Sequence, residues 1–166
     1  MSPGSPVSPV PPASIVAVLS GRPDSLEAVR WAAWLSQQAG LRLDVVHAYT
    51  REPGAGADAG SCARRESRER ARARTWLAAA LDECPALPHD LRLVVAEGEL
   101  EQVVGANLHE GDVLVSGSHG PAGLVSWGCR IRGCPVVLVP ASGIAGGPGR
   151  DAPSTHPRLA ATGVPA

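Results

Sequence analysis

Short apolar runs recur along the middle of this chain, and segments with a helical spacing of apolar residues lie between them. Each run is four to nine residues long and rich in Val and Leu, which is typical of strands buried on both faces of a parallel sheet. The predicted strands are Ile15–Leu19, Leu41–Tyr49, Leu91–Ala96, Asp112–Val115 and Val136–Val139. The predicted helices are Asp24–Gln38, Ala63–Glu83 and Glu99–His109. This alternation predicts an α/β fold, a doubly wound parallel five-stranded sheet flanked by helices.

The first predicted helix carries signals for both of its ends. Asp24 is followed three positions later by Glu27, which is the spacing of a capping box, and Gly40 suits a left-handed stop. We therefore expect the Asp24 side chain to cap this helix. Before the second helix, the residues Gly, Ala, Asp and Pro in the stretch Thr50–Ser61 predict a loop.

The two ends of the chain differ in composition from its middle. Residues 1–13 are mostly Ser, Pro, Gly and Val, and residues 141–166 are rich in Gly, Pro, Ala and Thr. Segments of this composition have little apolar surface to bury, so we expect both tails to be disordered. The 166-residue chain then contains one domain, over residues 14–140.

The charge balance and the cysteines limit the classes of partner. A net charge of −1 argues against a nucleic-acid or membrane-surface binder. No apolar run is long enough to cross a bilayer and the amino terminus lacks a signal-peptide pattern, so we expect a cytoplasmic protein. The four cysteines show neither CxxC pairs nor zinc-finger spacing with His, which predicts neither a metal site nor a disulfide.

Arginine is concentrated in the first half of the second predicted helix. Arg65 with Glu69, and Glu66 with Arg70, are spaced i,i+4 and can form ion pairs on a solvated helix face. We interpret this segment as an exposed helix, with a binding patch for a polyanion as the alternative.

A glycine-containing loop follows the strand that begins at Asp112. Its residues Gly117–Gly120 read GSHG, and glycines let backbone N–H groups approach an anion closely because no Cβ blocks the path. Open α/β sheets also bind ligands at the carboxyl ends of their strands. The sequence therefore indicates a candidate phosphate site after this strand.

In this loop and in other segments, the chain resembles the universal stress protein family. The loop is similar to the glycine loop after that family's fourth strand, and Cys134–Pro140 is similar to its last strand. Ile15–Ala32 is similar to its opening strand, turn and first helix. With Val45–His47, the resemblance covers most of residues 14–140, and it implies an adenine-nucleotide alpha-hydrolase-like architecture.

The resemblance also implies where ATP would bind, since many members hold it between the turn after the first strand and the glycine loop. The positions that match this pocket are Ser20, Ala48, Gly117, His119 and Gly120. Ser20 stands where the family has an acidic residue. A hydroxyl accepts a weaker hydrogen bond than a carboxylate does, so this departure lowers the affinity that we expect for a nucleotide.

A second departure lies in the glycine pattern. Ten positions after Gly120, where the family has Gly followed by Ser or Thr, this chain has Arg130. Only thirteen residues separate Gly120 from Cys134, so we expect a truncated last helix that no longer presents its amino terminus to phosphates. We therefore expect a non-catalytic stress-response regulatory or interaction module, with ATP binding weakened or lost.

Two alternatives stay open. One is an ATP-binding stress switch with an intact pocket. The other is an ATP pyrophosphatase-like enzyme, because Ser20–Ser25 is similar to the SGGxDS loop of that class, with Arg22 in place of the second glycine. We expect no catalysis by His119, since the sequence places neither an acidic partner nor a nucleophile motif beside it. We expect His47 to be a core histidine bonded to the backbone.

The resemblance further implies a homodimer in which the last strand pairs with its copy. Val136–Val139 would otherwise leave an apolar edge with unpaired backbone groups, which symmetric pairing covers. Pro135 and Pro140 limit the length of that pairing. We also expect a further protein partner, which the sequence does not identify.

Overall fold

Five parallel strands form the centre of the fold. The computed structural model describes residues 13–51, 58–119, 134–141 and 158–159. In the spatial order β3-β2-β1-β4-β5, every pair of neighbours is parallel, so the predicted doubly wound sheet is confirmed. The strands are β1 (Ile15–Val18), β2 (Leu43–Tyr49), β3 (Leu91–Glu97), β4 (Val113–Gly117) and β5 (Val136–Val139).

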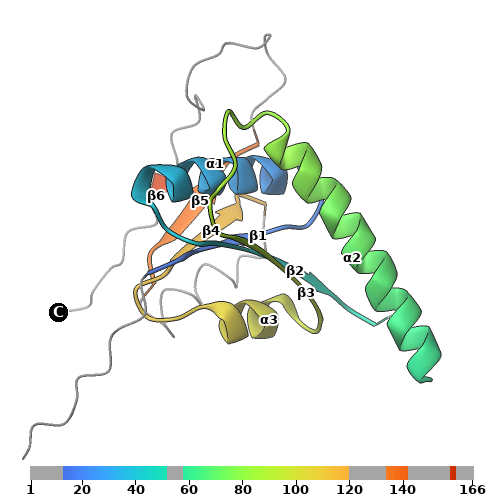
Figure 1. The fold of residues 1–166 in the computed structure, drawn as a ribbon. Coiled ribbons are helices and arrows are strands. Elements are labelled where there is room, and N and C mark those ends of the chain that lie inside the picture. Colours follow the sequence, from blue (N-terminus) through green and yellow to red (C-terminus); the bar gives the residue numbers. More distant parts are fainter. Residues whose placement is uncertain (1–12, 52–57, 120–133, 142–157, 160–166) are drawn as a thin grey trace, which may run out of the picture.

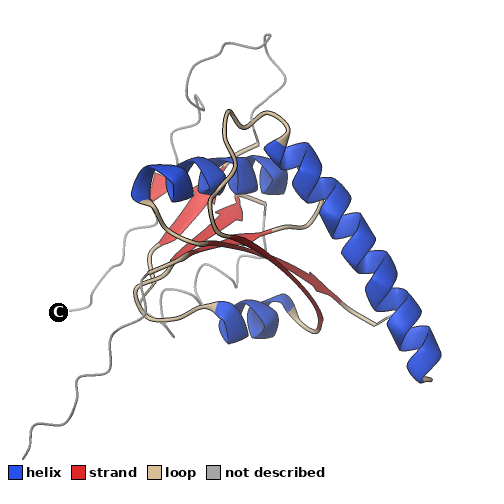
Figure 2. Cartoon of the chain, viewed as in Figure 1, coloured by secondary structure: helices blue, strands red, loops and turns tan. Residues whose placement is uncertain are grey.

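Helices cover both faces of this sheet (Figure 1). The helices α1 (Pro23–Ala39) and α2 (Ala59–Leu81) lie on one face, and the short α3 (Leu100–Asn107) lies on the other. Figure 2 shows the same three layers by type of element. Successive strand residues point to opposite faces, so Ile15 packs in the core beneath α1 and α2 while Val16 packs in the core beneath α3.

The strand order places β1 at the point where the chain changes direction across the sheet. β1 lies between β2 and β4, because the chain first builds outward through β2 to β3 and then returns to β4 on the other side of β1. The loops after β1 and β4 therefore diverge at the carboxyl edge of the sheet. Open α/β sheets bind ligands at such a point.

A sixth strand of two residues lies at the outer edge of β5. β6 (Arg158–Leu159) pairs antiparallel with β5, with Leu159 opposite Val137 and Arg158 opposite Leu138. The sequence predicts disorder there, because two residues in a Pro- and Ala-rich tail carry no strand signal. The structure places residues 158–159 in a strand, and the rest of 142–166 lies outside the described residues, so the disordered tail stays a prediction.

Helix α1 begins one residue before its predicted start. Pro23 is the first helical residue, which suits proline because its φ is already helical, and the N-cap is Arg22, without a side-chain capping bond. The predicted cap by Asp24 is wrong, because the Asp24 carboxylate turns to the loop after β4 instead. The predicted stop is confirmed, since Gly40 is left-handed with φ 65°.

Helix α2 begins four residues earlier than predicted. The carboxylate of its N-cap, Asp58, accepts the N–H of Ser61 at 2.9 Å, so Ala59–Ser61 are helical and do not belong to the predicted loop. The first half of α2 projects past the sheet (Figure 1). Its buried residues all lie in the second half and are Ala73, Leu77, Ala80 and Leu81.

The exposed half of α2 contains one of the two predicted ion pairs. Arg70 and Glu66 are 2.9 Å apart, as the i,i+4 spacing predicts. Glu69 lies 3.1 Å from Arg72 instead of pairing with Arg65. Glu66 and Glu69 thus each have an arginine of the same helix as a partner, while most of the arginines of α2 face solvent.

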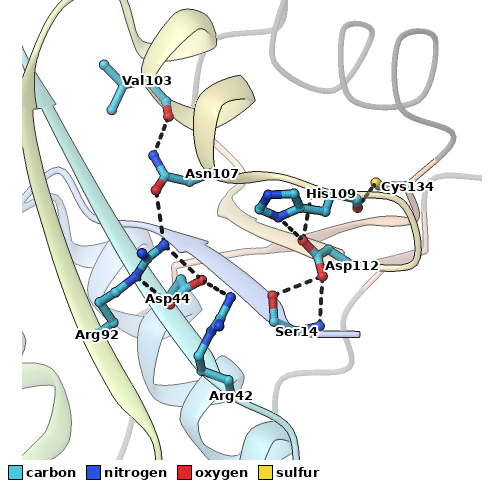
Figure 3. Close-up of polar contacts among 9 residues, drawn as sticks. All are labelled: Ser14, Arg42, Asp44, Arg92, Val103, Asn107, His109, Asp112 and Cys134. Carbon is cyan, nitrogen blue, oxygen red and sulfur yellow. Dashed lines mark hydrogen bonds and ion pairs between the residues drawn. The ribbon is translucent and has the colours of Figure 1, made fainter. Parts of the chain in front are cut away.

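Two buried carboxylates hold the amino edge of the sheet together (Figure 3). Asp44 on β2 is 0% exposed, and its carboxylate lies 3.0 Å from both Arg92 and Arg42. Asp112, before β4, accepts hydrogen bonds from the N–H and the hydroxyl of Ser14 at 2.7 and 2.9 Å. A buried charge needs such partners, and here they connect the beginnings of β1, β2, β3 and β4.

Some predictions fall on residues that the structure does not describe. The shortened crossover and truncated last helix lie at residues 120–133. Among the helices that are described, none combines the length and the apolar character needed to cross a bilayer. Within the same described ranges, His, Cys, Asp and Glu side chains do not gather in threes as metal ligands would.

Candidate functional site

A small cavity opens where the loops after β1 and β4 diverge. Its volume is about 170 Å³, whereas pockets for small molecules typically measure roughly 300–1,000 Å³. The lining contains three of the five positions predicted for a nucleotide pocket, Ser20, Gly117 and His119. The other lining residues are Val18, Arg22, Asp24, Ser25, Leu100 and Ser116.

The turn after β1 is held by a serine of α1. The hydroxyl of Ser25 donates to the carbonyl of Val18 at 3.1 Å and accepts the N–H of Ser20 at 2.8 Å. Ser20 is thus fixed through its backbone, while the residue itself is exposed. Its neutral hydroxyl offers a ligand a weaker acceptor than a carboxylate would at the same position.

The Asp24 side chain reaches from the first turn of α1 to the loop after β4. It is only 3% exposed, and its Oδ2 accepts the N–H of His119 at 2.8 Å. Its carboxylate also lies 3.3 Å from Nδ1 of His119 and 3.5 Å from Nε of Arg22. Burial raises the pKa of Asp24, but the His119 N–H and the charges of His119 and Arg22 outweigh it, so this pKa lies below its ordinary value. The loop therefore holds an ionised carboxylate at neutral pH.

Gly117 is required by that carboxylate. A Cβ at residue 117 would lie 2.5 Å from Oδ2 of Asp24 and 2.7 Å from its Cγ. The φ of Gly117 is not positive, so close approach and not backbone conformation explains the glycine. The sequence attributes this glycine to the approach of a phosphate, whereas in the structure a side chain of the same chain occupies the space against it.

His119 has an acidic partner that the sequence did not indicate. Its side chain is 63% exposed, with Nδ1 at 3.3 Å from Asp24 and 3.2 Å from the hydroxyl of Ser118. The expectation that no carboxylate lies beside His119 is therefore wrong, because the pairing of β1 with β4 brings together residues 95 positions apart. Both partners meet the same ring nitrogen, unlike a hydrolase triad, in which acid and nucleophile meet opposite nitrogens.

Two predicted pocket positions do not join this cavity. Ala48 lies on β2 opposite Ala96 of β3, packs against the core beneath α3 and does not line the cavity. Gly120 lies outside the described residues. The described site therefore combines the turn after β1 with Gly117 and His119.

A tryptophan from α2 fills the space beside the turn after β1. A Cβ on Gly21, whose φ is 73°, would come within 2.3 Å of the Trp76 ring. The same ring meets His47 edge-on, with ring centroids 5.4 Å apart. Nδ1 of His47 lies 2.9 Å from the carbonyl of Leu19, and Nε2 lies 3.2 Å from Glu69. The prediction of a core histidine bonded to the backbone is confirmed.

Sequence reasoning missed the contributions of α2 to this region. Glu69 and Trp76 are seven residues apart, which is about two helical turns and places them on one face. That spacing was the available signal. The arginines around Glu69 instead led to the prediction that this face of the helix is exposed to solvent.

The family of this chain follows from its sequence. The sequence profile of the universal stress protein family matches residues 13–127, which is more than half of the 166 residues. The chain belongs to the universal stress protein family. Its cavity therefore lies where the family resemblance placed a nucleotide, between the turn after β1 and the loop after β4.

Solved structures of universal stress proteins have the same fold. A member from Burkholderia pseudomallei has a TM-score of 0.53 and 20% identity, over 78% of this chain and 96% of that chain. A member from Archaeoglobus fulgidus has a TM-score of 0.50 and 16% identity, over 76% and 97% of the two chains. A universal stress protein solved in complex with cAMP has a TM-score of 0.52 and 16% identity, over 78% and 98%. No curated protein sequence matches the chain.

Proposed function

We propose that this universal stress protein is a non-catalytic stress-response regulatory or interaction module of the cytoplasm, in which ATP binding is weakened or lost. The observation that carries the proposal is the position of the Asp24 carboxylate. The N–H of His119, which a phosphate oxygen would need, already donates to Asp24 at 2.8 Å. A triphosphate at this loop would also meet a buried negative charge, and like charges at short range repel.

The available space supports the same proposal. The cavity of about 170 Å³ is smaller than pockets that enclose a ligand of nucleotide size. The indole of Trp76 lies against Gly21, the first residue after Ser20. Two glycines that could admit a ligand to the backbone, Gly21 and Gly117, are both covered by side chains of this chain.

The alternative of an ATP-binding switch draws on one feature of the site. Arg22 brings positive charge to the cavity and His119 brings its backbone N–H, and a universal stress protein of similar fold was solved in complex with cAMP. In this chain both side chains already face Asp24. In an ATP-binding switch, the contacts of Asp24 with Arg22 and His119 would therefore have to break before ATP binds.

The pyrophosphatase-like alternative has less support. Such an enzyme needs an open loop over Ser20–Ser25, and Pro23–Ser25 already form the first turn of α1. The Ser25 hydroxyl is engaged by Val18 and by Ser20. These contacts leave this segment without an open anion-binding loop.

Two surfaces support a role in protein contacts. The first half of α2 has no buried residue before Ala73 and is rich in arginine, which suits an acidic surface of a protein partner. We also propose the homodimer through Val136–Val139 that the family resemblance implies. Because β6 already pairs with Val137 and Leu138, this dimer requires β6 to leave the edge of β5.

The test is the nucleotide content and the ATP affinity of the purified full chain. We expect native mass spectrometry to find no retained adenine nucleotide, and calorimetry to give a Kd for ATP weaker than about 1 mM, the equivalent of about −4 kcal/mol. Stoichiometric ATP without turnover would replace the proposal with the switch. Release of AMP and pyrophosphate would replace it with the enzyme.

A further inference from the structure

The loop after β4 already binds an anion, and that anion belongs to the chain. We propose that Asp24 is an internal ligand of this loop and determines its specificity, keeping out small molecules that carry a phosphate group. The inference rests on the proposed function, since it explains why the ATP site of this chain is weak. It also goes further, because it attributes the weak ATP binding to one side chain, which a single substitution can remove.

The geometry of the carboxylate is that of a bound ligand. Oδ2 of Asp24 accepts the backbone N–H of His119 at 2.8 Å, while the side chain is only 3% exposed. It packs so tightly on Gly117 that a Cβ there would approach Oδ2 to 2.5 Å. A glycine loop binds an anion through a backbone N–H donor and through the space left by a glycine. Oδ2 of Asp24 occupies both, since it accepts the N–H of His119 and lies against Gly117.

The charges around the carboxylate favour an external anion once Asp24 is neutral. Arg22 and His119 are the charged or titratable side chains that approach Asp24 at 3.5 and 3.3 Å. Asp24 compensates the positive charge of Arg22. Without its charge the cavity keeps Arg22, the N–H of His119 and the hydroxyl of Ser20, a set of donors suited to phosphate oxygens.

The size of the cavity limits the class of ligand. About 170 Å³ is smaller than typical pockets for drug-sized molecules, so the group received at the loop itself is the phosphate. A free phosphate compound and a nucleotide share that chemistry. Titrations with pyrophosphate, AMP and ATP distinguish them, since pyrophosphate alone suffices if the loop provides all of the affinity.

The experiment compares three variants of the full chain by calorimetry at low ionic strength. Asp24→Asn removes the charge and keeps the shape, and Asp24→Ala also removes the carboxylate from Gly117, while the backbone carbonyl carbon of residue 24 stays 2.9 Å from where a Cβ at residue 117 would lie. Asp82→Asn is the matched control, because Asp82 makes the same charge change at the exposed C-cap of α2. We expect both Asp24 variants to bind pyrophosphate at least about tenfold more tightly than the wild type, with Asp24→Ala the tighter, and Asp82→Asn to match the wild type.

Each outcome separates this inference from the proposed function. If folded Asp24 variants bind pyrophosphate, AMP and ATP no better than Asp82→Asn, the inference is overturned while the proposed function stands. If the wild type itself binds ATP tightly, the proposed function fails first. Should both Asp24 variants unfold, the amide resonance of His119 in the wild type decides. We expect that 10 mM pyrophosphate, on the order of ten times the 1 mM Kd that marks weak binding, does not shift the His119 amide resonance. A saturable shift of that resonance would overturn the inference.

Discussion

The indole ring of Trp76 lies directly on the backbone of Gly21. A Cβ at residue 21 would come within 2.3 Å of the ring, and the φ of Gly21 is 73°. Two independent constraints therefore select glycine at this turn, the left-handed backbone and the ring above it. The contact fixes helix α2 to the turn after β1, beside the candidate site.

Replacing Gly21 with Ala should destabilise the fold by about 2–4 kcal/mol, since it adds left-handed strain to a steric clash with Trp76. Gly40→Ala is the matched control, because Gly40 is also left-handed, at φ 65°, but a Cβ at residue 40 would meet nothing within 4 Å. We expect that control to lose only about 1 kcal/mol. Urea unfolding of both variants measures the difference. Equal losses would mean that Trp76 yields without penalty.

Replacing Arg92 with Ala should destabilise the protein more than replacing Arg70 with Ala. Arg92 contacts both oxygens of Asp44, at 3.0 and 3.3 Å, and Asp44 is fully buried. Its loss leaves a buried carboxylate with Arg42 as its ion-pair partner, which should cost about 1–3 kcal/mol. Arg70 pairs with Glu66 on an exposed helix face, where such pairs contribute about 0.3–0.5 kcal/mol. Chemical denaturation of the two variants gives the comparison, and a smaller loss for Arg92→Ala would contradict it.

The contact of Asp24 with the loop after β4 should lose its stabilising effect in acid. The pKa of Asp24 lies below its ordinary value of 3.8, so the folded state holds the proton less firmly than the unfolded state does. Its contribution is therefore complete above pH 3.8 and is lost as the pH falls through the lower, folded pKa.

Wild type and Asp24→Asn provide the measurement of this pH effect. We expect their difference in free energy of unfolding to be unchanged from about pH 6 to about pH 4 and to shrink as the pH falls below 3.8. A difference that stays constant would show that the carboxylate charge does not contribute.

Releasing β6 should favour the homodimer through β5. Leu159→Pro disrupts the two-residue ladder in which Leu159 lies opposite Val137, because proline lacks the N–H and has a fixed φ. Thr162→Pro makes the same substitution three residues later, at a position outside the described residues. In analytical ultracentrifugation we expect Leu159→Pro to dimerise at lower concentration than the control. Identical association of the two variants would exclude β6 as a cover of this edge.

The sequence predicted the layers of the fold because its strands and helices are each internally consistent. The Val- and Leu-rich runs predicted all five parallel strands, and Gly40 predicted the end of α1. The first residue of each helix was predicted less well, because several nearby residues are of types that can serve as its N-cap. Asp58 caps α2, which begins four residues ahead of the predicted start. The Asp24 carboxylate accepts the N–H of His119 and does not cap α1.

The candidate site was only partly predictable, because its central contacts join residues remote in sequence. Gly117 and His119 were identified from the glycine loop, but their partner Asp24 lies on α1. Neither spacing nor composition relates residue 24 to residue 117. Only the arrangement of β1 beside β4 does so, and that is a property of the assembled sheet.

The span of the Asp24–His119 contact has a consequence for how the chain folds. Its two residues are 95 positions apart, and closing so long a loop is entropically unfavourable until other contacts have brought the ends together. We therefore expect the bond to form after β1 and β4 are paired, late on the folding route. Stabilisation that forms late in folding slows unfolding and leaves the folding rate almost unchanged, so we expect this single carboxylate to prolong the lifetime of the native state.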